Sequence, residues 1–115
     1  MEYAKLGKSG IEVSRLCVGC MSFGRPSEDF HEWTLNPNET EEIVKKALDL
    51  GINFFDTANT YSHGTSEEYL GRALKKNIAR NKVVIGTKVY FNEGHLSKEA
   101  VRREIDGSLK RLGTD

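Results

Sequence analysis

Short apolar segments alternate with amphipathic helical segments along most of this chain. Apolar runs predict strands at residues 16–19, 52–55 and 83–87, and a segment with helical spacing of apolar residues follows each of them. Strands that alternate with helices pair in parallel and are joined by right-handed crossovers. Parallel sheets are buried on both faces, so these strands need covering layers. The alternation therefore predicts an α/β fold.

The predicted helices are bounded by capping residues. Asn38, with an acid three residues later, predicts the first helix start, and Gly51 predicts its end. Ser66 and Ser97 predict the starts of the second and third helices, and Gly113 ends the third. The apolar residues predicted to share a face are Ile43, Val44, Ala47 and Leu48, then Leu70, Ala73 and Leu74, and finally Val101, Ile105, Leu109 and Leu112.

A β-hairpin is predicted at residues 3–15, where a glycine-bounded turn cluster separates two short segments. Three βα units follow at residues 16–51, 52–77 and 83–113, and together they form one domain over residues 1–115. Another strand is expected to follow Asp115. A closed eight-stranded barrel takes about 250 residues. We therefore expect the N-terminal part of a (β/α)8 TIM barrel, with the barrel incomplete.

The charge balance points away from nucleic acid and membrane partners, because 17 basic residues offset 17 acidic ones. No apolar run approaches the roughly 20 residues that span a bilayer, and the N-terminus lacks the apolar core of a signal peptide. A cytoplasmic protein is the expectation. A partial barrel exposes sheet edges, so we also expect self-association or pairing with the missing C-terminal part of the barrel.

Cys17 and Cys20 form a single C-x-x-C pattern. A zinc site needs a second pair of ligands, and a redox motif needs a helix N-terminus. Residues three apart on a strand point to opposite faces, so packing or backbone contacts are favoured over metal or disulfide chemistry. His31 and His95 do not have metal-ligand spacing, and no metal site is predicted.

Charged residues follow two of the predicted strands. Asp56 ends the strand at 52–55, Lys88 follows the strand at 83–87, and Tyr61 lies five residues after Asp56. Loops after the carboxyl ends of parallel strands carry the active sites of α/β barrels. Taken singly, the three residues could be a loop cap, a packed aromatic and a solvated strand end. Together they indicate a catalytic site.

Residues 51–61, GINFFDTANTY, with Ser66, Glu67, Leu70 and Gly71 after them, are similar to the signature of the aldo-keto reductases. Residues 6–14 resemble the N-terminal hairpin of that family, residues 19–24 the segment after its first strand, residues 86–88 its lysine strand, and residues 108–115 the approach to its fourth strand. The segment HEWTL at residues 31–35 is similar to a bacterial YajO-like branch.

This resemblance implies a (β/α)8 barrel that reduces aldehydes and ketones with NADPH and without a metal. It implies a catalytic tetrad of Asp, Tyr, Lys and His, of which Asp56, Tyr61 and Lys88 are present. The histidine is expected beyond Asp115, as are most loops that hold the cofactor, so the 115 residues alone are expected to be inactive. Cys20, Met21 and Asp56 are implied to lie next to the cofactor.

The chemistry of these residue types suits carbonyl reduction. Negative charge builds on the carbonyl oxygen, so the site needs a proton donor there, and an unperturbed tyrosine has a pKa of about 10. An ammonium nearby stabilises the phenolate, and an aspartate keeps that ammonium charged. We therefore assign Tyr61 as general acid, Lys88 as its tuning group and Asp56 as the orienting partner.

Two other functions remain open from the sequence. The barrel could bind NADPH as a regulatory or sensor subunit without significant turnover, or Lys88 could form a Schiff base with a carbonyl substrate.

Phe30 and Trp33 lie in the long segment after the first strand. They could form the wall of a substrate pocket or pack on the barrel rim. His63 is expected to be solvated.

Overall fold

The computed structural model describes residues 1–115. Strands β1 (Tyr3–Lys5) and β2 (Glu12–Ser14) pair in antiparallel fashion, with Ala4 opposite Val13. They form the predicted hairpin. The turn between them includes two glycines at positive φ, Gly7 at +58° and Gly10 at +78°, a backbone conformation that side chains disfavour.

Three parallel strands form the central sheet in the order β3 (Val18–Gly19), β4 (Phe54–Asp56) and β5 (Val84–Gly86). Gly19 lies opposite Asp56, which in turn lies opposite Gly86, so the three strands end at one edge. The strands are shorter than the predicted apolar runs. Leu16 and Cys17, for example, lie outside β3 and are exposed.

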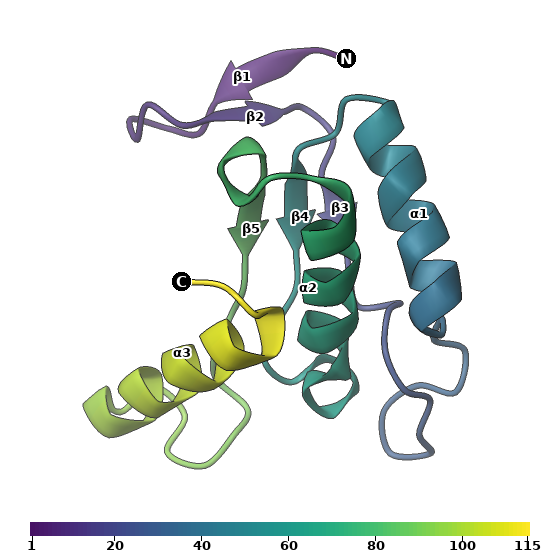
Figure 1. Ribbon diagram of the computed structural model, residues 1–115. Coiled ribbons are helices and arrows are strands. Elements are labelled where there is room, and N and C mark those ends of the chain that lie inside the picture. The colour runs from purple at the N-terminus through teal and green to yellow at the C-terminus, as the bar shows by residue number, and fades with distance from the viewer.

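Three helices follow the strands: α1 (Pro37–Asp49), α2 (Thr65–Asn77) and α3 (Lys98–Leu112). Two short 3-10 turns, η1 (Tyr61–Gly64) and η2 (Arg80–Lys82), precede α2 and β5. α1 and α2 pack side by side along the sheet, and α3 packs beside α2 (Figure 1). The hairpin lies beyond the amino-terminal ends of the parallel strands, opposite the edge where the strands end (Figure 1).

The apolar core lies between the sheet and the helices. Phe55 on β4 is fully buried, together with Val44 of α1 and Leu70 of α2. Phe54, which points to the opposite face of the sheet, is only partly buried. The single layer of helices on a three-stranded parallel sheet agrees with the predicted incomplete α/β barrel. No helix is both long enough and apolar enough to span a membrane.

The start of α1 differs from the prediction. Asn36, not Asn38, is the N-cap: its Oδ1 accepts the backbone N–H of Glu39 at 2.9 Å, and a Glu39 carboxylate oxygen accepts the N–H of Asn36 at 3.1 Å. This reciprocal capping box places Pro37 at the first helical position, where its fixed φ suits the helix and its missing N–H costs nothing. The prediction was wrong by two residues.

Of the two other predicted helix starts, one was wrong and one was right. Gly64, at a φ of +95°, is the N-cap of α2, so the assignment of Ser66 as that cap was wrong; Ser66 lies inside the first turn. The prediction for α3 is confirmed, because Ser97 accepts the N–H of Ala100 and Gly113 ends the helix at a φ of +69°.

The apolar stripe predicted on α3 is only partly buried. Leu112 is buried, whereas Val101 and Ile105 are exposed. Helix α3 packs against α2, and its end lies directly over Gly71 of that helix. This packing direction buries Ala100, Ser108 and Leu112 and leaves Val101 and Ile105 uncovered.

Candidate active site

The two charged residues predicted at the strand ends form an ion pair. Asp56 is the last residue of β4, and Lys88 follows β5 by two residues. The Nζ atom of Lys88 lies 2.8 Å from Oδ2 of Asp56 and also donates to the backbone carbonyl of Thr57 at 2.7 Å. Neighbouring parallel strands thus bring an ammonium and a carboxylate together.

Tyr61 completes this group. Its ring centroid lies 4.9 Å from Nζ of Lys88, a cation–π distance. The loop that carries the tyrosine is tied to the next strand end, because the N–H of Asn59 donates to the carbonyl of Lys88 at 3.1 Å. The structure therefore gathers Asp56, Tyr61 and Lys88 at the carboxyl-terminal edge of the sheet, where parallel α/β folds carry their sites.

The environment of Lys88 favours its charged form. Partial burial alone would lower the pKa of Lys88, but the hydrogen bond to Asp56, the charge of Asp56 and the neighbouring Tyr61 outweigh it, so the pKa is raised above its ordinary value. The side chains of Lys88 and Asp56 are both about half exposed, so solvent screens part of their attraction. Lys88 is therefore a persistent cation beside the phenol.

A left-handed turn follows Tyr61. Ser62 and His63 have φ angles of 47° and 55°, which are rare for residues other than glycine. The hydroxyl of Thr65 donates to the carbonyl of Ser62 at 2.6 Å and accepts the N–H of Arg25 at 2.8 Å. These bonds stabilise a backbone conformation that would otherwise be costly, and strain of this kind often accompanies functional sites.

The loop at residues 25–35 contacts the tyrosine loop. Nε2 of His63, which was expected to be solvated, lies 3.1 Å from Oδ1 of Asp29. The hydrogen bond from His63 lowers the pKa of Asp29, although both side chains remain largely exposed. The ring of Phe30 lies 6.3 Å from that of Tyr61 and 4.2 Å from that of His31.

A row of aromatic rings leads away from Tyr61 along this loop. The ring of His31 stacks on that of Trp33, with centroids 4.4 Å apart and planes at 26°. Trp33 is 55% exposed, so it presents a ring face to solvent instead of packing into the core. Phe30 lies between this stack and Tyr61. The exposure of Trp33 argues against its burial on the barrel rim.

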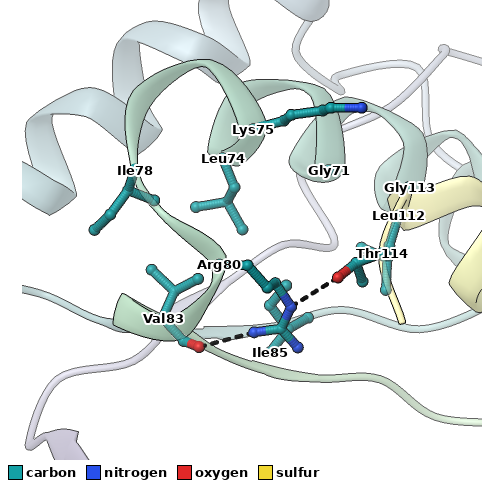
Figure 2. A pocket seen from close by; sticks show the side chains of 10 residues that line it. All are labelled: Gly71, Leu74, Lys75, Ile78, Arg80, Val83, Ile85, Leu112, Gly113 and Thr114. Carbon is teal, nitrogen blue, oxygen red and sulfur yellow. Dashed lines mark hydrogen bonds between the residues drawn. The ribbon is translucent and has the colours of Figure 1, made fainter.

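A cavity of about 210 Å³ adjoins Tyr61 and Lys88 and is lined by residues 58–61 and 88–91. A second cavity, of about 260 Å³, lies between α2, α3 and β5 (Figure 2). In the second one, Arg80 donates to the carbonyl of Val83 and to the hydroxyl of Thr114, both at 2.9 Å. This second cavity lies beside Val83, at the start of β5, and neither Tyr61 nor Lys88 lines it. The cavity next to Tyr61 is therefore the one that a reacting substrate could use.

The two cysteines lie in different environments. Cys17 is exposed, whereas Cys20 is fully buried, and both are free. Burial raises the pKa of the Cys20 thiol to about 12, so this thiol stays protonated. Met21 beside it is partly exposed. Of the three residues predicted to lie next to a cofactor, Asp56 and Met21 present accessible surface, whereas contact by the Cys20 side chain would need a shift of its loop.

Sequence reasoning missed the buried contacts behind the site. Glu67 is fully buried in the first turn of α2 and bonds to Thr87 and Arg111. Glu67 entered the sequence analysis only as part of the family signature, and no local pattern reveals its partners, because they lie 20 and 44 residues away. Residues that commonly bind metals do not gather in groups of three or more anywhere in the chain.

The sequence and the fold of the chain both match known proteins. The model of the aldo/keto reductase family matches residues 15–115. The chain is 42% identical to versiconal hemiacetal acetate reductase of Aspergillus parasiticus, with 99% of this chain and 40% of that protein covered. It is 34% identical to a probable voltage-gated potassium channel subunit beta of Oryza sativa subsp. japonica, with 100% and 35% covered.

Among solved structures, the thermostable aldo-keto reductase Tm1743, crystallised with the inhibitor epalrestat, superposes on the chain with a TM-score of 0.82. The two are 32% identical, and the match covers 100% of this chain and 40% of that one. The chain thus spans about two fifths of the length of the relatives described here.

Proposed function

Because the chain belongs to the aldo/keto reductase family, we propose that the natural polypeptide carrying it reduces aldehydes and ketones to alcohols with NADPH. The observation that supports this most is the 2.8 Å contact between Lys88 and Asp56 beside the ring of Tyr61. A phenol, an ammonium and a carboxylate in this order are the groups that a proton donor to a carbonyl oxygen requires.

Each of the three residues has a distinct role in this proposal. The reduced nicotinamide, when bound, supplies a hydride to the carbonyl carbon. Tyr61 donates its phenolic proton to the carbonyl oxygen, where negative charge develops. The ammonium of Lys88 stabilises the resulting phenolate, and Asp56 orients that ammonium and keeps it charged.

The residues at the strand ends fit the nicotinamide end of such a cofactor. Met21 offers an accessible apolar side chain, and the carboxylate of Asp56 is half exposed at the same edge of the sheet. We propose that these two residues, with Cys20 after a movement of its loop, hold the cofactor near Tyr61. Phe30 and Trp33 do not line the cavity beside Tyr61, so they would extend the pocket for a small carbonyl substrate along the loop at residues 25–35.

An activity assay tests the proposal. The purified natural polypeptide is mixed with NADPH or NADH and a panel of aliphatic and aromatic aldehydes and ketones, and cofactor oxidation is followed by absorbance. We expect carbonyl-dependent oxidation, with NADPH preferred, and an alcohol product. A folded polypeptide that oxidises neither cofactor with any carbonyl would contradict the proposal.

A sensor function is the second candidate, and the similarity to a probable potassium channel subunit beta favours it. A sensor would bind the cofactor, seen as a change in nicotinamide fluorescence, without significant turnover. A Schiff-base mechanism through Lys88 is less favoured, because this chemistry needs a neutral amine and the raised pKa of Lys88 keeps it charged. Borohydride trapping with a carbonyl substrate would detect it.

We also propose that the 115-residue chain associates with itself or with the rest of a barrel. Strands β3 and β5 each have an unpaired edge, and Val101 and Ile105 form an exposed apolar face on α3. We expect dimers or larger species in sedimentation velocity at micromolar concentration. A monodisperse monomer that unfolds cooperatively would argue against this association.

A further inference from the structure

The first turn of α2 contacts the segments that follow all three parallel strands, and it lies at the edge where those strands end (Figure 1). The hydroxyl of Ser66 donates to the carbonyl of Cys20, after β3, at 2.6 Å. The same hydroxyl lies 2.8 Å from that of Thr57, after β4. Oε2 of Glu67 accepts the hydroxyl of Thr87, after β5, at 2.9 Å.

Glu67 is an unusual residue for this position because it is charged and fully buried. Its second carboxylate oxygen accepts a hydrogen bond from Nε–H of Arg111, on α3, at 2.8 Å, and the side chain of Arg111 is itself mostly buried. Removing two charges from water is costly, and an ion pair offsets that cost only with good geometry and further hydrogen bonds. The hydroxyl of Thr87 supplies such a hydrogen bond. This bond joins the carboxylate of Glu67 to the segment that follows β5.

Thr87 precedes Lys88 in the chain, so its position constrains that of the lysine. We propose that Glu67 is a positioning residue, which orients Lys88 toward Asp56 and Tyr61 through the hydroxyl of Thr87. The backbone carbonyls of Gly86 and Lys88 accept the N–H groups of Thr57 and Asn59 in the neighbouring loop, not groups of α2. The hydrogen bond from the Thr87 hydroxyl to Glu67 therefore links this segment directly to α2. The catalytic consequence of this proposal rests on the reductase function proposed above.

Two conservative variants test the link in the natural polypeptide. Thr87→Val keeps the shape of the side chain but removes the hydroxyl donor, and Glu67→Gln replaces a charge-assisted hydrogen bond with a weaker neutral one. We expect Thr87→Val to lower kcat/KM for carbonyl reduction by roughly ten- to a hundredfold, since small displacements of a catalytic group are costly. Glu67→Gln should have a smaller effect, and the double variant should lose no more than Thr87→Val alone.

The second measurement does not depend on turnover. Lysine labelled with ¹³C at Cε is titrated by NMR, and the Lys88 signal is assigned from its loss in Lys88→Arg. In both variants, the raised pKa of Lys88 should fall toward its ordinary value, because the contacts with Asp56 and Tyr61 that raise it are weakened. Glu41→Gln is the matched control: Glu41 joins α1 to the far end of α2 through Lys76 and Asn77. It should leave the titration unchanged.

The outcomes separate the two proposals. A purely structural role of Glu67 would lower the melting temperature of Glu67→Gln and Thr87→Val but leave the Lys88 titration as in the parent protein, and this would overturn the positioning role. A parent protein without any carbonyl turnover would refute the reductase function. The Lys88 titration would still decide whether Glu67 orients the lysine.

Discussion

Replacing Tyr61 by phenylalanine is expected to abolish carbonyl reduction and to leave cofactor binding intact. The substitution removes only the phenolic hydroxyl, and the ring that stacks over Lys88 and faces Phe30 stays in place. Without that proton donor, charge on the carbonyl oxygen is not neutralised in the transition state. A loss of about 10²- to 10⁴-fold in kcat is the usual effect of removing a general acid.

The measurement is steady-state reduction of the best carbonyl substrate, together with titration of NADPH binding by fluorescence. Tyr69→Phe is the matched control, because Tyr69 lies on α2, where its ring faces Arg72. It should keep the parent activity. Unchanged turnover in Tyr61→Phe would refute the assigned role, and lost cofactor binding would show that the hydroxyl acts in binding instead.

Replacing Gly71 by alanine is expected to destabilise the fold strongly. A Cβ atom at Gly71 would lie 2.2 Å from the carbonyl oxygen of Leu112 and 2.8 Å from its Cα, closer than real contacts allow. These are backbone atoms at the end of α3, so no side chain can rotate away, and the two helices must separate. Overpacking of this kind typically costs about 1–3 kcal/mol, and here it must also exceed the gain of about 1 kcal/mol from alanine in a helix.

Chemical denaturation of the natural polypeptide measures this effect. Gly71→Ala should lower the midpoint by an amount that corresponds to about 2 kcal/mol of unfolding free energy. Gly19→Ala is the control, because no heavy atom lies within 4 Å of a Cβ at that position and its φ is not positive. A Gly71→Ala protein as stable as the parent would show that α3 is not packed on α2 as described.

The positions of Asp56, Tyr61 and Lys88 at one edge of the sheet could be predicted because they depend on local pattern. Asp56 and Lys88 each follow a short apolar run, and the carboxyl ends of parallel strands must meet at one edge. The spacing of Tyr61 from Asp56 then limits where its ring can lie. The resemblance to a known family pointed to the same three residues.

Several local predictions were wrong where two candidate residues competed. Asn36 and Asn38 are both good caps, and Pro37 between them decides the matter, because proline fits the first turn of a helix. Ser66 is a good cap by type, but its hydroxyl binds Cys20 and Thr57 instead, and Gly64 takes the cap position through a positive φ. Side-chain type alone cannot rank a cap against a tertiary hydrogen bond.

The amino-acid sequence by itself determined the order of the elements, the parallel pairing of the strands and the edge at which Asp56, Tyr61 and Lys88 meet. These properties follow from apolar periodicity and chain connectivity, which act over a few residues at a time. Only the tertiary structure decided that Glu67 binds Thr87 and Arg111 and that Gly71 touches Leu112. Such contacts join residues 20 to 44 positions apart, and they depend on how the helices pack, which no local pattern encodes.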